Sequence, residues 1–86
     1  MARPIHRHEI PVDDRWHTIT GCGTPLHVDC RNPSLVEFWA WASDDQPARE
    51  FRVYGTGQLI PDEGTTHRGT AIAPGGQLVW HLIERR

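Results

Sequence analysis

Residues that favour turns recur about every eight to twelve positions along this chain. They are glycine, proline, asparagine and aspartate clusters at 11–14, 21–23, 32–34, 44–47, 55–57, 61–64 and 74–76. The segments between them are long enough for short strands and too short for most helices. Such a rhythm is typical of small sandwiches and barrels. The chain has 86 residues, so we expect a single domain over 1–86.

Seven candidate strands lie between these turns, at roughly 4–10, 15–20, 25–31, 35–42, 49–55, 67–73 and 77–84. Apolar and polar residues alternate in several of them, with Val28 and Cys30 on one face of 25–31 and Phe51 and Val53 on one face of 49–55. The sequence therefore predicts a mainly β fold, as a small antiparallel sandwich or barrel-like sheet of about six to seven short strands.

Two of these segments are apolar on both faces. In 35–42, Trp39 and Trp41 lie opposite Phe38, and 77–84 carries apolar residues on both sides. Strands of this kind need cover on both faces, which suggests self-association through Trp39 or Trp41, or through an exposed edge strand. A short buried helix over 34–42 is the alternative, and the aromatic content favours a strand. We expect the following residues to be mostly buried: Phe38, Trp39, Phe51, Val53 and Trp80.

Charge and hydropathy exclude several partners. The net charge is −2, which gives no electrostatic basis for binding a nucleic acid polymer or an anionic membrane. No apolar run approaches the roughly 18 residues of a membrane span, and residues 1–6 lack the apolar core of a signal peptide. The expectation is a soluble cytoplasmic protein. All nine basic residues are arginine, so lysine-based catalysis is excluded.

Several short sequences follow one another in a distinctive order. The most specific are Phe-x-Val-x-Gly-Thr-Gly at 51–57, Gly-Thr at 69–70 and Val-Trp-His at 79–81. This order resembles a family of short phage and actinobacterial proteins, a domain of unknown function. The resemblance implies a phage-related origin, and hence the host cytoplasm, with no assigned activity. His6 and His8 depart from the family pattern, and Cys22 and Cys30 match none of its motifs.

Metal binding and catalysis are weakly supported by spacing. His6, His8, Cys22, His27 and Cys30 include neither of the tight pairs that structural zinc sites use, Cys-x2–4-Cys and His-x3–5-His. The carboxylate pairs at 13–14, 44–45 and 62–63 all fall in turns, where aspartate bonds to the backbone. No Gly-x-Ser-x-Gly element is present. We therefore expect no metal and no cofactor, and favour a protein that is not an enzyme.

The Gly-Thr-Gly element at 55–57 is the strongest candidate for a binding site. Its glycines permit a turn whose N–H groups can cradle an anion, although the favoured explanation is a hairpin turn with a bulge, in which glycine is needed for geometry alone. Aromatic and cationic side chains flank it on both sides in sequence. The candidate ligand-binding residues are Arg52, Tyr54, Gly55, Thr56, Gly57, His67, Arg68 and His81.

Three functional hypotheses follow. The first is a small non-enzymatic binding protein that acts as a homo-oligomer. The second is a phage counter-defence protein that sequesters a small anionic, nucleotide-like signal. The third is a small hydrolase that uses His67 or His81 as general base. A ligand recovered intact from the protein would separate the second from the third.

Overall fold

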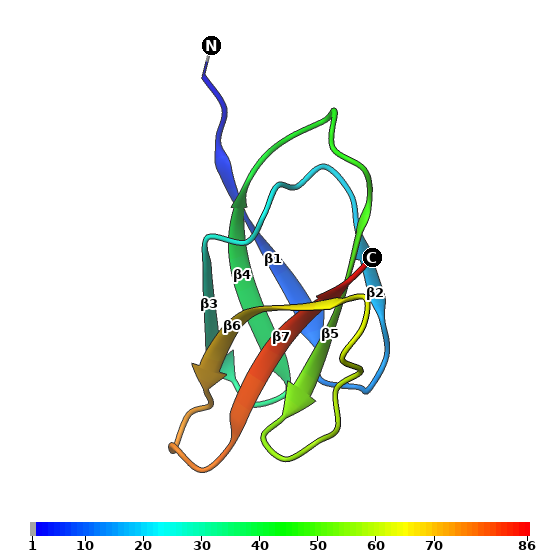
Figure 1. Ribbon diagram of the computed structural model, residues 1–86. Helices are drawn as coiled ribbons and strands as arrows, with labels where there is room; N and C mark the ends of the chain where they lie inside the picture. Colours follow the sequence, from blue (N-terminus) through cyan, green and yellow to red (C-terminus); the bar gives the residue numbers. More distant parts are fainter. Residues whose placement is uncertain (1) are drawn as a thin grey trace.

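The structure, a computed structural model, describes residues 2–86, and among these it contains strands and no helix (Figure 1). Every expected strand is present, with ends that differ by no more than two residues, and the strand prediction for 35–42 is confirmed. The strands are β1 (Ile5–Pro11), β2 (His17–Ile19), β3 (His27–Asn32), β4 (Leu35–Trp41), β5 (Arg49–Gly55), β6 (Thr65–Ile72) and β7 (Val79–Arg85).

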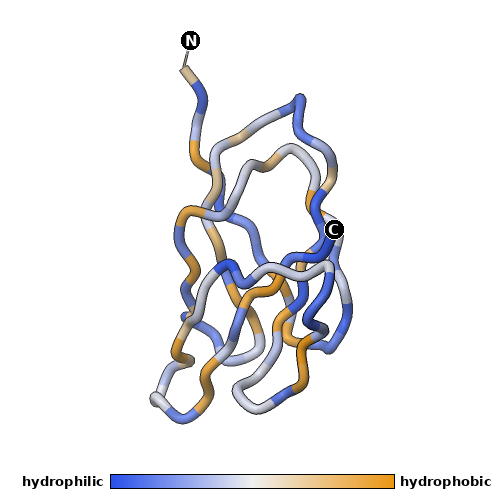
Figure 2. The backbone as a smooth tube through the Cα atoms, in the orientation of Figure 1, coloured by the Kyte–Doolittle hydropathy of each residue, from blue (hydrophilic) through white to orange (hydrophobic). Residues whose placement is uncertain are grey.

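The strands form two antiparallel sheets that pack face to face. The three-stranded sheet has the order β1-β4-β3, and the four-stranded sheet has the order β2-β5-β7-β6. The sheets do not close into a barrel, so the sandwich prediction is confirmed. Hydropathy follows this arrangement, because hydrophobic residues recur along the strands and hydrophilic residues occupy the tip of the loop between β4 and β5 (Figure 2).

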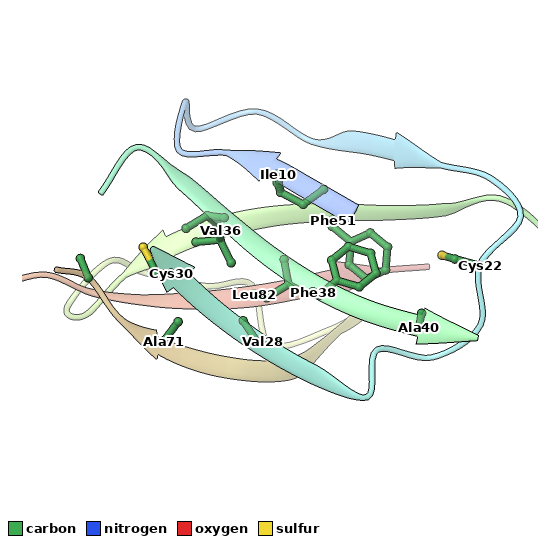
Figure 3. Close-up of a cluster of buried hydrophobic side chains, with 12 residues drawn as sticks. Ile10, Cys22, Val28, Cys30, Val36, Phe38, Ala40, Phe51, Ala71 and Leu82 are labelled. Atoms are coloured by element: carbon green, nitrogen blue, oxygen red, sulfur yellow. The ribbon is translucent and has the colours of Figure 1, made fainter. Parts of the chain in front are cut away.

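The core lies between the two sheets. Phe38 of β4 and Phe51 of β5 meet at its centre, with ring centroids 4.7 Å apart (Figure 3). Val36, Val53 and Leu82 are fully buried beside them. Along β4 and β5 these buried residues occupy alternate positions, as expected for strands whose inner side chains face a core.

Gly69 sets how closely the sheets approach at one edge. A Cβ atom at this position would lie 2.4 Å from Cγ2 of Val28 on β3. No side chain fits at that distance, so glycine is required here for packing. A β-bulge between His67 and Gly69 brings this glycine to the inner face.

Two tryptophans are less buried than expected. Phe38, Phe51 and Val53 are fully buried, whereas Trp39 and Trp80 are only partly so. Trp39 lies on the outer face of β4, where its ring meets the His27 ring with centroids 5.7 Å apart. Trp80 packs against the edge of the core, and its Nε1 donates to the Pro33 carbonyl at 3.1 Å.

The loop from Thr56 to Gly64 positions the candidate site. It connects β5 to β6 and runs back along the sheet beside β5 (Figure 1). Ile83 points to the outer face of β7, opposite Arg52, yet is only 2% exposed. The loop therefore supplies the cover that the doubly apolar strand β7 requires. At the far end of the loop, the Arg86 N–H donates to the Gly64 carbonyl at 2.9 Å.

Candidate functional site

A pocket of about 370 Å³ opens on the outer face of the four-stranded sheet, beneath the loop between β5 and β6. Its floor comes from β6 and β7, and the loop forms one wall. Its lining residues are Gly55, Thr56, Gly57, Gln58, Ile60, Pro61, Asp62, Thr65, His67, His81 and Ile83. Five of the eight residues expected to bind a ligand are among them, which are Gly55, Thr56, Gly57, His67 and His81.

A chain of hydrogen bonds joins two histidines and two threonines at this pocket. His81 Nε2 lies 2.9 Å from Thr56 Oγ1, and His81 Nδ1 lies 2.9 Å from Thr70 Oγ1. Thr70 Oγ1 in turn lies 2.9 Å from His67 Nε2. The strand register explains the arrangement, because Thr70 pairs with His81 and His67 pairs with Ile83 on the same face.

The hydrogen bonds of this chain depend on one another. A neutral imidazole has one N–H and one acceptor nitrogen, and a hydroxyl has one hydrogen to donate and can accept two hydrogen bonds. If Thr56 donates to His81 Nε2, His81 donates from Nδ1 to Thr70, and Thr70 can then either donate to His67 or accept from it. If Thr70 instead donates to His81 Nδ1, His81 donates from Nε2 to Thr56, and His67 must donate to Thr70. The direction of the Thr70 hydroxyl and the tautomer of His81 are therefore coupled.

The Gly-Thr-Gly element is a tight turn whose N–H groups are largely used. The Gln58 N–H donates to the Gly55 carbonyl at 3.1 Å, and Gly57 has φ of 93°, as the third residue of a type II turn requires. The Gly55 N–H donates to Gln58 Oε1 at 2.6 Å, and the Thr56 N–H donates to the Val79 carbonyl at 3.3 Å. Among the described residues of this turn, the Gly57 N–H is left to meet a ligand, so a multi-donor nest is not formed.

Arg52 and Tyr54 do not line the pocket, although they lie on the same sheet face. They pair across the strands with Ile83 and His81, two residues of the lining. The Arg52 guanidinium lies over the Tyr54 ring, 4.5 Å from its centroid, and Nη2 is 3.8 Å from Asp14 Oδ1. That distance is too long for a hydrogen bond. The Arg52 guanidinium is therefore fixed in place with hydrogen-bonding capacity to spare.

Arg68 does not line the pocket. Its Nε donates to Glu84 Oε1 at 2.8 Å, and Arg49 Nη1 lies 3.1 Å from both oxygens of the same carboxylate. The β-bulge at 67–69 accounts for this, because it takes Arg68 out of the regular alternation of β6. The structure thus separates Arg68 from His67, its sequence neighbour.

Several lining residues were missed by sequence reasoning. Asp62 lies in a turn, where its carboxylate is explained by hydrogen bonds to the backbone, while Gln58, Thr65 and Ile60 stand in no motif. Thr70, which joins the two histidines, falls in the Gly-Thr pair at 69–70 that the family resemblance highlights. That pair was the one feature that could have pointed to it.

The predicted interface residues lie on the opposite side of the sandwich. Trp39 and Trp41 occupy the outer face of β4, and Trp41 is 38% exposed beside the exposed side chains of Ile5 and Leu26. The Arg3 guanidinium lies 5.2 Å from the centroid of the Trp41 ring. These residues form an apolar patch of the kind that protein contacts use.

The centre of that same face is a buried ion-pair cluster. Glu37 is 3% exposed, and it accepts from Arg7 at 2.7 Å and from Arg31 at 2.8 and 2.7 Å. Hydrogen bonds from Arg31, followed by those from Arg7, lower the pKa of Glu37 to about 2 against the opposing effect of its desolvation. Glu9 and Asp29 flank it on the neighbouring strands.

The cysteines and the remaining histidines do not assemble into a site. No group of three or more histidine, cysteine or acidic side chains in residues 2–86 is placed to hold a metal ion. Cys22 and Cys30 are buried as free thiols at opposite ends of the core (Figure 3). Burial raises the pKa of both thiols, which disfavours the reactive thiolate.

Two further observations concern the chain as a whole. Within residues 2–86 there is no helix of the length and apolarity that a membrane crossing requires. A sequence profile of one family, described as a domain of unknown function (DUF7352), matches residues 1–86. No curated protein and no solved structure matches the chain.

Proposed function

The chain belongs to the DUF7352 family, a domain of unknown function, and we propose that it is a small, phage-related binding protein that acts as a homo-oligomer. Its ligand site is the pocket beneath the loop between β5 and β6. The single observation that supports this most is the hydrogen-bonded chain of Thr56, His81, Thr70 and His67 at a pocket of about 370 Å³. Convergent polar groups in a largely apolar hollow are typical of small-molecule sites.

The chemistry of the lining favours a ligand with both a ring and a charged group. Ile60, Pro61 and Ile83 offer an apolar wall, and the threonines, histidines and Gln58 offer donors and acceptors. The lining contains no arginine. A phosphate group would bind at the edge of the pocket, to Arg52 and to the N–H of Gly57. A nucleotide-like molecule, with its base or sugar in the pocket, matches this division.

A phage-related origin gives such binding a purpose. Phages commonly encode small counter-defence proteins, and one that sequesters an anionic nucleotide signal in the host cytoplasm needs only affinity and abundance. Homo-oligomerisation through the patch of Ile5, Leu26, Trp39 and Trp41 would add burial to a domain with a small core.

Binding is tested by thermal unfolding with adenosine monophosphate and with inorganic phosphate. At about 100 times its dissociation constant a ligand stabilises the fold by roughly 2.7 kcal/mol, which raises the melting temperature of a domain this size by several degrees. Thr56→Val should abolish the shift. Thr66→Val, an exposed threonine on β6 outside the hydrogen-bonded chain, should retain it. No shift with either probe, or an equal shift in both variants, would remove the proposal. Mass analysis should return the nucleotide intact.

A hydrolase is the second candidate function, and one observation favours it. The Thr56 hydroxyl lies within hydrogen-bonding distance of His81 Nε2. Of the two histidines considered as general base, His81 is therefore the better placed. His67 reaches it only through Thr70.

A further inference from the structure

The Thr56–His81 pair has the geometry of an activated nucleophile. Nucleophilic hydroxyls in proteins are recognised by a base within about 2.6–3.2 Å, with the base itself oriented by a third group. Thr56 Oγ1 and His81 Nε2 are 2.9 Å apart. Thr56 is exposed at the tip of a turn and lines the pocket, so the hydroxyl is accessible to a bound molecule.

The other side of His81 is oriented as such a base requires. Its Nδ1 lies 2.9 Å from Thr70 Oγ1, and Thr70 Oγ1 lies 2.9 Å from His67 Nε2. When Thr70 donates to His67, its oxygen accepts from His81 Nδ1–H, which leaves Nε2 unprotonated toward Thr56. Thr70 and His67 are therefore positioning residues that select the tautomer in which His81 can take a proton.

A donor for a developing negative charge stands next to the nucleophile. The N–H groups of Gly55, Thr56 and Gln58 are donated within the chain. The N–H of Gly57 follows Thr56 directly. A backbone N–H of the residue after the nucleophile is a recurring donor to the oxyanion of acyl transfer.

We propose that Thr56 is an acyl-accepting nucleophile, with His81 as its base, toward small carboxylic esters whose apolar part packs on Ile60, Pro61 and Ile83. Thr56 Oγ1 bonds to the ester carbonyl carbon while its proton passes to His81 Nε2. The carbon–alkoxide bond then breaks, and His81 returns that proton to the leaving alkoxide. Water hydrolyses the acyl-threonine by the same route, which restores the Thr56 hydroxyl and releases the acid.

The absence of a carboxylate from the hydrogen-bonded chain sets the expected rate. Replacing the aspartate of a serine–histidine–aspartate triad by an amide lowers kcat by about 10⁴. Thr70 orients His81 but supplies no charge to stabilise the imidazolium. We therefore expect acylation in a single turnover to be readily measured and the release of acid to be slow.

The experiment uses p-nitrophenyl acetate as the probe and follows both nitrophenol release and the mass of the whole chain. The expected result is a burst of about one nitrophenol per chain, with the acetyl group mapped to Thr56. Thr56→Ser should keep the burst and Thr56→Val should abolish it. His81→Gln should slow acylation by about 10²-fold or more. Thr66→Val serves as the matched control and should behave like the parent.

A positioning role for Thr70 has its own measurement. Thr70→Val should lower the limiting acylation rate while the ester concentration at half-saturation stays unchanged, because the substituted residue orients the base and does not hold the ester. A purely structural effect would instead lower the melting temperature and raise that concentration.

The inference rests on the pocket of the proposed function, and the two can fail separately. Acetylation of His67 or His81 in place of Thr56, or a burst of equal size in Thr56→Val, overturns the nucleophile while leaving ligand binding intact. An absent burst together with a nucleotide-induced thermal shift shows a pocket that only binds. If neither the burst nor the shift occurs, both proposals fall.

Discussion

The outer faces of the two sheets use polar residues in opposite ways. On the three-stranded sheet, Glu37 is held by Arg7 and Arg31, and all its oxygens are engaged. On the four-stranded sheet, uncharged threonines and histidines form a chain whose end groups retain hydrogen-bonding capacity at an open pocket. On the first face the charged groups are paired with one another and hold β1, β3 and β4 together. On the second face some polar groups remain free to form further hydrogen bonds.

The difference arises from the connections between strands. β3 and β4 are joined by a tight turn at Pro33 and Ser34, which is too short to fold over the outer face of the three-stranded sheet. β5 and β6 are joined by a nine-residue connection, 56–64, which lies over Ile83 and creates a hollow. Polar groups retain hydrogen-bonding capacity where a loop encloses them beside a pocket, and they lose it where an ion-pair partner saturates them.

Glu37→Gln should have the largest effect on stability. The change removes the carboxylate that binds both Arg7 and Arg31, and breaking a buried ion pair costs about 3–5 kcal/mol. Both arginines are substantially exposed, which reduces the expected loss to about 2 kcal/mol. Urea unfolding measures it, and Glu63→Gln in the exposed loop is the control. A loss below about 0.5 kcal/mol would mean that this face is not held together by its charges.

Arg68→Ala and Arg52→Ala should separate structure from binding within the four-stranded sheet. Arg68 pairs with Glu84, which Arg49 still neutralises after the change, so we expect a loss of about 1 kcal/mol and an unchanged response to adenosine monophosphate. Arg52→Ala should weaken that response, because Arg52 pairs across the strands with Ile83 of the pocket lining and its described ion pair, with Asp14, is long at 3.8 Å. Urea unfolding and thermal shift measure the two effects. If Arg68→Ala instead abolished the response to adenosine monophosphate and Arg52→Ala did not, Arg68 would be a ligand-binding residue.

The sequence alone predicts the strands of both sheets, but it does not predict which side chains meet at the pocket, for physical reasons. Alternation and turn residues located all seven strands, because side-chain direction in a strand depends only on local spacing. The same alternation could not foresee the bulge that diverts Arg68, since bulges depend on the partner strand. Nor could it place residues 58–62 over Ile83, because a loop's path follows from tertiary packing.

Trp41→Ser should act on assembly more than on folding. The residue is partly exposed in the apolar patch of the three-stranded sheet, so its loss should lower the apparent mass of an oligomer while changing monomer stability by about 0.5 kcal/mol or less. Light scattering at tens of micromolar gives the mass. Leu59→Ser is the matched control, because Leu59 is 94% exposed on the loop of the other sheet. A parent mass near 9.8 kDa would show that the patch does not join copies.

As the pH is lowered, the free energy of unfolding should fall in two separate steps, to each of which one group of the three-stranded sheet contributes. His8, stacked on Phe38 with centroids 5.0 Å apart, has its pKa lowered from 6.5 by burial and then by the nearby His6. The unfolded chain therefore binds this proton first, and stability falls as the pH drops below about 6.5. Glu37 acts lower, since its pKa is about 2 in the folded protein and 4.5 as the ordinary value. Its contribution is complete above pH 4.5 and is lost as the pH falls toward 2.

The loss of stability just below pH 6.5, the upper step, is the smallest of these effects and the one most specific to a single residue, His8. One group changes the unfolding free energy by at most about 1.4 kcal/mol per pH unit. His8→Phe keeps an aromatic ring against Phe38 and removes the titrating group, so the slope just below pH 6.5 should diminish while the lower step remains. Glu37→Gln should do the opposite, leaving the upper step and reducing the lower one. It should not abolish the lower step, because Asp13 and Glu50 also contribute there: His17 lowers the pKa of Asp13, and Arg85 lowers the pKa of Glu50. Urea unfolding at a series of pH values measures both. If His8→Phe leaves the upper slope unchanged, that slope does not come from His8, and the acid response does not distinguish the two sheets.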